Sequence, residues 1–422
     1  MIISNWSKLG VIVIALAYTP AATHFYMPAS GNSVINQSPR ERKGKPKRPK
    51  FGSSLKKLRW DPSTQSAVEQ KEERNRPVEE SDSSIKLETL YVVFDIVVQN
   101  SSGRIVKGLD RDDFIITEDG KRQETATLAL GDGESLPRSI VLIIDSSGSQ
   151  MPYLETSIAA AKTLIDRLGP MDELAIVTQD VKLVADFTSD KLKLKRVLDS
   201  ILKEHRKGKH GKSFQFSALF ATLRELTTNE ETRPIIIFQT DGDEAPAFRD
   251  QPDLERFEYL RGDSPLPEFG LGDIYATAEK SRATVYSVIT MDRLVDIPEE
   301  EINQRGAEIM RKRGIKRPEG ALESPKLDTL QRVFTDVFQR GQRAASHVAS
   351  LTGGWTAWLE RPDQAAEIYE GILTDINNRY LIGYYPTNVA RDGKLRKVRI
   401  EVRGHPEYTV HGRNGYFAPI NK

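Results

Sequence analysis

The chain has 422 residues, which is enough for one large domain and a smaller one. Its 61 basic and 60 acidic residues nearly cancel, so the whole chain is not a polyelectrolyte, although local charge blocks remain. The absence of cysteine excludes disulfides, thiolate metal sites, a cysteine nucleophile and a lipidated cysteine anchor.

The first 31 residues are predicted to form a signal peptide or an N-terminal anchor. Lys8 precedes an apolar run from Leu9 to Tyr18. This run is shorter than a membrane-spanning helix, which needs about 20 residues, but it suits the hydrophobic region of a secretory signal. We therefore expect export to the periplasm, the cell envelope or the secreted space. An uncleaved anchor is the alternative, and no other transmembrane helix is expected.

Residues 32–84 are predicted to be a disordered, charged linker. Lys and Arg dominate from Arg40 to Arg59, acidic residues dominate from Glu69 to Asp82, and apolar residues are few. Such a segment cannot bury enough surface to offset its chain entropy. The basic part could also be attracted to an anionic envelope surface. No specific nucleic-acid site is expected, because aromatic residues do not alternate with the basic ones.

Both ends of the remaining chain are predicted to contribute to one small β module. Residues 87–134 show strand patterns, including the β-branched run from Leu90 to Val98. Residues 380–419 show further strands, including Leu395 to Val402. Two or three strands alone are marginally stable in water. We therefore expect the strands of residues 380–419 to pair with those of residues 87–134.

Residues 137–378 alternate between strand and helix patterns, which predicts an α/β domain with a doubly wound, mostly parallel, six-stranded sheet. The expected strands are 140–144, 173–178, 181–187, 234–241, 284–290 and 355–359, and the expected helices are 154–168, 191–202, 274–282, 341–350, 363–376 and one that begins near Ser217.

Two charged insertions, 244–272 and 292–340, interrupt the domain. The second is predicted to contain helices over 299–313 and 328–338. The first lies directly after the loop that begins at Asp241, so it could cover the site at the end of that strand. It contains Arg261-Gly262-Asp263, which resembles an integrin-recognition sequence, but so short a motif arises easily by chance.

Polar side chains follow the first predicted strand of this domain. The apolar run Ile140–Ile144 suits a strand buried on both faces. Asp145, Ser147 and Ser149 then present oxygen donors at alternate positions. They lie at the carboxyl end of a central strand, where doubly wound sheets place their ligand sites. Hard oxygen donors suit Mg²⁺, and an ordinary turn rich in Ser and Gly is the alternative.

Two later positions point to the same edge of the sheet. Ser217 lies near the start of a helix, where a capping role is the alternative. Asp241 follows the apolar run that begins at Pro234 and precedes a Gly, which is also compatible with a simple turn. Because several polar ends converge on one edge, we predict a metal site formed by Asp145, Ser147, Ser149, Ser217 and Asp241.

These residues resemble a known family. Asp-x-Ser-x-Ser, a later hydroxyl, and Thr-Asp-Gly after an apolar strand are similar to the metal-ion-dependent adhesion site of von Willebrand factor type A (VWA) domains. The resemblance implies direct ligation by Ser147 and Ser149, and ligation by Asp145 and Asp241 directly or through water. Ser217 stands where the family usually has Thr. Gln215 and Phe216 replace the family's Gly pair.

The resemblance extends to both ends of the folded region. Residues 108–114, 118–121, 378–386 and 413–419 resemble the VWFA-related proteins described from Acidobacteria. The family fold implies a strand order of 3-2-1-4-5-6 with the third strand antiparallel.

The function that these observations predict is a metal-dependent protein-binding or adhesion module. It would use Mg²⁺, with Mn²⁺ or Ca²⁺ as alternatives, to capture an acidic side chain of a protein partner. A structural envelope protein with a decayed metal site is one alternative, favoured by Gln215 and Phe216. An enzyme that transfers phosphoryl groups through Asp145 is another. Ser147 stands where such enzymes usually have a second carboxylate, and other catalytic motifs are absent from the sequence, so the protein is predicted not to be an enzyme.

Overall fold

The computed structural model describes residues 58–61, 66–69, 90–130, 137–226, 232–244, 269–312 and 325–420. The predicted signal peptide, most of the linker and Arg261-Gly262-Asp263 lie outside the described residues. Within the linker, β1 (Leu58–Asp61) pairs with β2 (Ser66–Glu69) in antiparallel fashion, which differs from the expected disorder. Trp60 and Val68 are residue types that favour strands. Among the helices described, none is both long enough and apolar enough to span a membrane.

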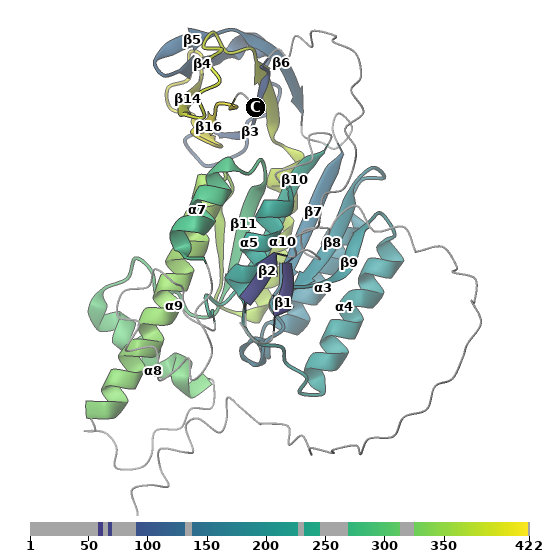
Figure 1. The fold of residues 1–422 in the computed structure, drawn as a ribbon, viewed down its shortest axis with the longest axis vertical. Helices are drawn as coiled ribbons and strands as arrows, with labels where there is room; N and C mark the ends of the chain where they lie inside the picture. Colours follow the sequence, from purple (N-terminus) through teal and green to yellow (C-terminus); the bar gives the residue numbers. More distant parts are fainter. Residues whose placement is uncertain are drawn as a thin grey trace, which may run out of the picture.

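The central unit is a six-stranded sheet with the order β12-β11-β10-β7-β8-β9 (Figure 1). Every neighbouring pair is parallel except β8 and β9. This confirms the predicted α/β fold, the strand order and the antiparallel third strand. The strands are β7 (Arg138–Ile144), β8 (Glu173–Thr178), β9 (Lys182–Thr188), β10 (Arg233–Thr240), β11 (Thr284–Thr290) and β12 (Thr356–Leu359).

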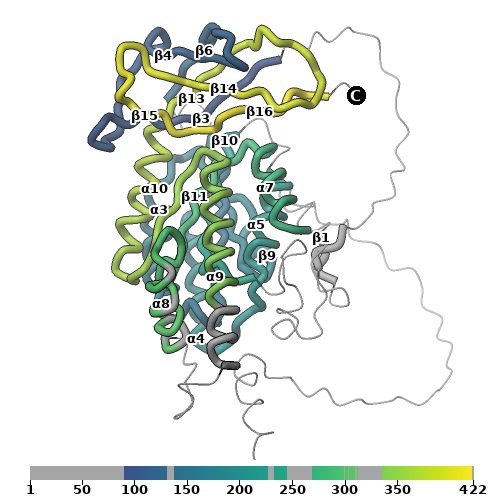
Figure 2. The backbone as a smooth tube through the Cα atoms, turned by 90° about the vertical axis from the view of Figure 1, so that its left-hand side faces the viewer, coloured from purple at the N-terminus to yellow at the C-terminus, as the bar shows by residue number. Residues whose placement is uncertain are grey.

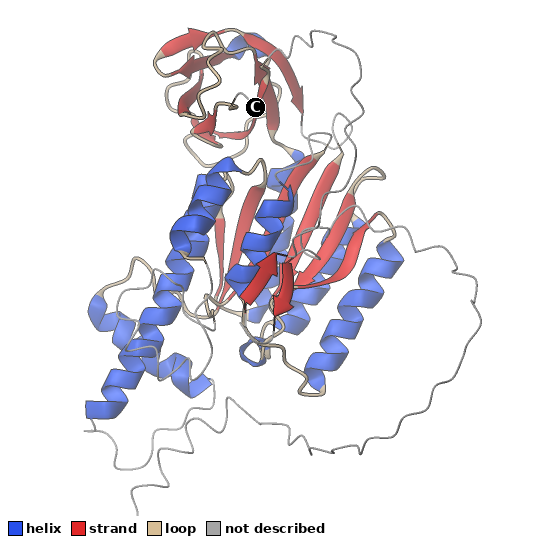
Figure 3. Cartoon of the chain, viewed as in Figure 1, coloured by secondary structure: helices blue, strands red, loops and turns tan. Residues whose placement is uncertain are grey.

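Helices cover both faces of this sheet (Figure 3). β7 is buried along its whole length, because alternate residues contact opposite helical layers. Ile140 and Leu142 pack with the layer of α3, α4 and α10, and Val141 and Ile143 pack with the layer of α5, α7 and α9. The helices are α3 (Leu154–Asp166), α4 (Lys191–Arg206), α5 (Gln215–Leu226), α7 (Leu271–Lys280), α9 (Pro325–Leu351) and α10 (Ala365–Asn377), and the short 3-10 helices are η1 (Arg111–Asp113), η2 (Gly148–Gln150) and η3 (Pro362–Gln364).

The second insertion differs from its predicted boundaries. α8 (Glu299–Lys312) agrees with the prediction, but α9 is one continuous helix of 27 residues. The predicted break between 338 and 341 is therefore wrong. Gly341 lies inside α9, where it packs closely against Gly242. This tertiary contact outweighs the weak helix propensity of glycine.

The two ends of the folded region form one β module, as predicted (Figure 2). It contains two four-stranded antiparallel sheets, β15-β3-β13-β6 and β16-β14-β4-β5. Each sheet combines strands from both ends, with Ile382 opposite both Phe94 and Leu128. Phe94, Tyr384 and Val398 contribute to the shared core. The strands are β3 (Val92–Gln99), β4 (Phe114–Glu118), β5 (Lys121–Gln123), β6 (Thr125–Leu130), β13 (Tyr380–Tyr384), β14 (Leu395–Val402), β15 (Thr409–His411) and β16 (Gly415–Phe417).

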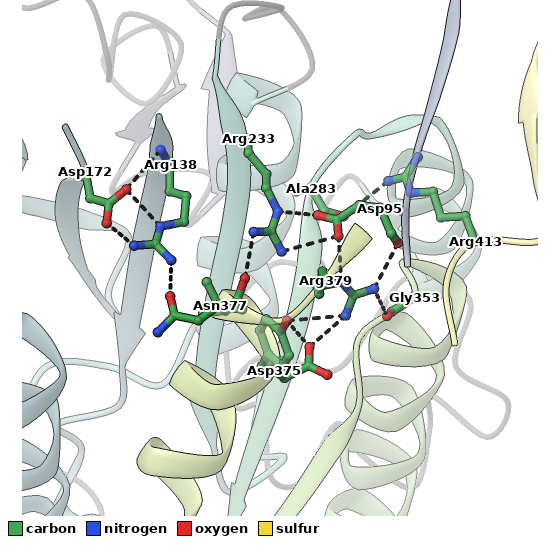
Figure 4. Close-up of polar contacts among 12 residues, drawn as sticks. Asp95, Arg138, Asp172, Arg233, Ala283, Gly353, Asp375, Asn377, Arg379 and Arg413 are labelled. Atoms are coloured by element: carbon green, nitrogen blue, oxygen red, sulfur yellow. Dashed lines mark hydrogen bonds and ion pairs between the residues drawn. The ribbon is translucent and has the colours of Figure 1, made fainter. Parts of the chain in front are cut away.

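A buried ion network joins the β module to the end of the central sheet at which β7 and β10 begin (Figure 4). Arg379 donates to Asp95 Oδ1 at 2.6 Å and to Asp375 Oδ2 at 2.8 Å, and it also donates to the Gly353 carbonyl. Arg233 pairs with the same Asp95. Burial raises the pKa of Asp95, but the two guanidinium groups outweigh burial and hold that pKa below its ordinary value.

The β module and the predicted metal site therefore lie at opposite ends of the central sheet. Arg233 opens β10, whereas Asp241 follows it. β7 contains seven residues, each adding about 3.3 Å, so roughly 20 Å of strand separates the two ends. The carboxyl end of the sheet remains clear of the β module (Figure 1).

Candidate functional site

Four of the five predicted site residues lie together at the carboxyl edge of the central sheet. Asp145 and Asp241 follow the neighbouring strands β7 and β10. The Ser147 backbone N–H donates to Asp145 Oδ1 at 2.9 Å. The hydroxyls of Ser147 and Ser149 are 2.9 Å apart, and Ser149 Oγ donates to Asp241 Oδ2 at 2.6 Å. A continuous series of oxygen donors therefore connects the two strand ends.

The two carboxylates of this group are both 0 % exposed. Burial raises the pKa of Asp145 well above its ordinary value, and the nearby Asp241 raises it further. Asp243 acts in the same direction. Two acidic groups in a low-dielectric environment repel each other strongly unless a proton or a cation lies between them. The electrostatics of this position therefore favour added positive charge, supplied either by a proton or by a cation.

Gln215, the first residue of α5, places its side-chain amide between the two carboxylates. Its Nε2 donates to Asp145 Oδ2 and to Asp241 Oδ1, each at 2.8 Å, and lies 2.8 Å from Ser213 Oγ. Its carbonyl oxygen accepts from the Thr240 hydroxyl. An amide nitrogen has only two hydrogens, so three acceptors share them. The amide dipole thus supplies part of the positive potential that a cation would supply, and a cation would compete with it.

The fifth predicted residue, Ser217, donates its hydroxyl hydrogen to Glu244 Oε1 at 2.7 Å. The same carboxyl group accepts from the backbone N–H of Phe216 at 2.7 Å, which satisfies a free donor at the start of α5. The Ser217 oxygen keeps its lone pairs while it donates. Ligation by Ser217 therefore stays a prediction, with Glu244 as its direct neighbour.

Glu244 should make the stability of the metal-free protein depend on pH. Burial raises its pKa to about 8, against the opposing hydrogen bonds from Ser217 and Phe216. A raised folded-state pKa gives stability that is complete below the unfolded pKa and is lost as pH rises through about 8. We expect the unfolding free energy in chelator to fall between pH 5 and 8.5, by up to about 1.4 kcal/mol per pH unit.

Urea unfolding of the wild type and of Glu244→Gln, across this pH range, measures the effect. The variant should show a shallower decline, because its side chain cannot ionise. If the unfolding free energy of both proteins fell equally with pH, ionisation of groups other than Glu244 would cause the pH dependence.

Side chains that the sequence did not identify hold the loop after Asp145. Ser146 donates through its backbone N–H and its hydroxyl to Gln179 Oε1, both at 2.9 Å. His205 Nδ1 lies 3.0 Å from the Ser146 carbonyl oxygen. Gln179 directly follows β8 and His205 lies in α4, so two separate parts of the domain position the predicted ligands. A sequence pattern could not have shown them, because each depends on the packing of separate elements.

The loop after Asp241 rests against α9 through two glycines. Gly242 has a φ of +86°, which favours glycine. A side chain at Gly341 would overlap with the Gly242 carbonyl group. The position of Asp241 therefore depends on the absence of a side chain at Gly341.

Gly341→Ala is expected to destabilise the protein by about 1–3 kcal/mol, because overpacking forces backbone shifts. Gly371→Ala in α10 is the matched control. Its added methyl would meet Trp355 at an ordinary 3.6 Å, so improved helix propensity should make it neutral or stabilising by about 0.5–1 kcal/mol. Thermal unfolding compares the two. Equal effects at both positions would show that the Gly341 contact is not tight.

The donor set fits a hard divalent cation. Carboxylate and hydroxyl oxygens converge from two loops, and Mg²⁺ accepts such ligands together with water. Within the described ranges, no group of three or more His, Asp or Glu side chains is placed to hold a metal ion. A cation here would therefore depend on the hydroxyls of Ser147 and Ser149.

The strand order and the acid–hydroxyl loops agree with the fold that the resemblance to VWA domains implies. No family model and no curated protein matches the chain. Among solved structures, an aerotolerance-related membrane protein from Bacteroides fragilis is similar over 57% of this chain and 98% of its own, with 19% identity and a TM-score of 0.34. BatB from Bacteroides thetaiotaomicron is 18% identical over 57% and 97%, with a TM-score of 0.31. Proximal thread matrix protein 1 from the mussel byssus is 10% identical over 57% and 48%, with a TM-score of 0.32. At these values, the similarities support no inference about function.

Proposed function

We propose that this protein is an exported binding module that captures a carboxylate of a protein partner through a divalent cation. Asp145, Ser147, Ser149 and Asp241 would hold the cation, with Ser217 as a further ligand and Mg²⁺ as the preferred ion. The observation that carries the proposal is the buried pair Asp145 and Asp241, connected by the two serine hydroxyls. Export rests on the apolar run behind Lys8.

The chemistry of the donors suits capture of an anion. Neutral hydroxyl ligands leave a divalent cation electrophilic, so it can accept an anionic ligand from outside the protein. Ser149 is only partly buried, and Gly148 beside it is exposed. A partner carboxylate could therefore approach the loop from solvent without disturbing the buried strands.

The two alternatives receive less support. For phosphoryl transfer, Ser147 stands where enzymes with an aspartate nucleophile usually have a second carboxylate. For a decayed site, Gln215 is the strongest observation, because its amide stands between the carboxylates. The serine hydroxyls that connect Asp145 with Asp241 nevertheless supply the oxygen ligands that a hard cation needs. We therefore prefer a binding module to an enzyme or a purely structural protein.

Mn²⁺ as a paramagnetic probe tests this proposal. Mn²⁺ bound to the full chain should enhance water-proton relaxation, and glutarate should lower the enhancement by replacing a bound water. Glutaramide, which lacks the carboxylates, should have no effect. Asp145→Ala should remove the enhancement, whereas the exposed control Asp199→Asn should retain it. An enhancement that survives Asp145→Ala, or that ignores glutarate, would contradict the proposal.

A further inference from the structure

A cluster of positive charge lies beside the candidate site. The end of α4 and the segment between α4 and α5 carry Arg206, Lys207, Lys209 and Lys212, which we call the basic rim. All four side chains belong to exposed residues. The segment 204–212 contains only one acidic residue, Glu204. In a chain that is almost neutral as a whole, this segment has a local excess of positive charge.

Contacts fix the basic rim against the loop of predicted ligands. His205, where this segment begins, lies 3.0 Å from the Ser146 carbonyl oxygen. The His210 ring packs edge-on against His205, with 4.6 Å between ring centroids. The same ring lies where a side chain on Gly148 would meet it at 3.5 Å. The segment that carries the basic rim therefore borders the loop that contains Ser147 and Ser149, at the exposed residue Gly148.

The ion pairs of the basic rim are exposed and exchangeable. Glu204 accepts from Lys209 at 2.8 Å and from Lys207 at 2.9 Å, and all three side chains are exposed to solvent by more than a third. Arg206 pairs with Glu155 at 2.9 Å, and both side chains are more than half exposed. Exposed pairs of this kind contribute little to stability. The rim cations can therefore exchange these partners for the acidic groups of a ligand.

We propose that the partner is an acidic protein segment that binds at several points. This inference rests on the proposed function: one carboxylate completes the coordination of the cation, and neighbouring carboxylates of the same segment pair with the basic rim. The rim would supply electrostatic attraction and select a segment with clustered acids over a single exposed Glu or Asp.

A nucleic acid fits these observations less well. The basic rim is one short segment, and the acidic residues Glu155, Glu204 and Asp180 lie around it. A regular phosphate backbone would meet these carboxylates, whereas a flexible peptide can place its acids between them. The same negative groups disfavour a broad anionic surface.

The test uses a fluorescent peptide that alternates Glu and Gly, with the full chain in Mg²⁺ or in chelator. The rim variant carries Lys207→Gln, Lys209→Gln and Lys212→Gln. The matched control carries Lys394→Gln, Lys397→Gln and Arg399→Gln, which remove the same charge from exposed positions on β14 and directly before it, in the β module. We expect Mg²⁺-dependent binding that the rim variant weakens about tenfold and the control leaves nearly unchanged.

Each other outcome overturns the inference in a recognisable way. Equal Mg²⁺-dependent binding by the rim variant and the wild type would remove the role of the rim and leave the proposed function standing. Peptide binding that persists in chelator would show that the rim binds acidic segments without the cation. In the separate Mn²⁺ experiment, the absence of a response to glutarate would show that the proposed function fails. Tighter binding of an oligothymidine than of the peptide would show that this edge of the sheet is a nucleic-acid site. Binding of neither probe would also contradict the inference.

Discussion

Replacing Arg379 by Met is expected to lower the unfolding free energy by about 3–5 kcal/mol, because it leaves buried Asp375 without its cation and removes one of the two guanidinium groups that pair with Asp95. Arg379 is 0 % exposed and donates to Asp95, Asp375 and the Gly353 carbonyl. These partners belong to the β module, to α10 and to the segment before β12. Loss of the guanidinium should therefore destabilise the junction between the β module and the central domain.

Urea unfolding of the full chain measures this loss. The matched control is Arg399→Met, whose pair with Glu401 is exposed and should contribute at most about 1 kcal/mol. A loss at Arg379 no larger than at Arg399 would show that the buried network does not hold the two units together.

Replacing Gln215 by Ala is expected to have two opposite effects. Without cation, the variant should lose about 1–3 kcal/mol, because buried Asp145 and Asp241 lose their shared hydrogen-bond donor. The affinity of the variant for Mg²⁺ should rise by about tenfold, because the cation no longer competes with the amide. A tenfold change in affinity corresponds to about 1.4 kcal/mol.

Thermal unfolding in chelator and in Mg²⁺ separates the two effects. Gln123→Ala is the control, since Gln123 is also buried and hydrogen-bonded, but lies in the β module. It should destabilise the protein without changing its response to Mg²⁺. Weaker Mg²⁺ binding by Gln215→Ala would mean that the amide supports the cation instead of competing with it.

The fold could be predicted from the sequence where local pattern and packing agree. β7 is a continuous apolar run because both of its faces are covered, so its sequence alone indicates a central strand. The pairing of β3 with β13 could be predicted because each end of the chain offered strands that needed partners. The two halves of α9 could be predicted as helices, but their continuity through Gly341 could not, since the close contact of Gly341 with Gly242 depends on the packing of separate elements.

The candidate site was predictable in part for a similar reason. Asp145 and Asp241 each follow an apolar strand, so their position at one edge follows from the parallel sheet. The hydrogen bonds of Gln215 and Glu244 could not be predicted, because their partners come from other elements of the fold. The pairing of Asp95 with Arg379 spans 284 positions, and no local pattern indicates it.

Titration calorimetry of Mg²⁺ into the full chain, with Asp145→Ala beside the wild type, tests the central claim most directly. The account predicts saturable binding of one Mg²⁺ by the wild type, and no binding by Asp145→Ala in a protein whose circular dichroism shows that it remains folded. Asp145 carries the buried charge that offsets dehydration of the cation. An identical isotherm for both proteins, or no binding by the wild type, would contradict a cation site at this loop.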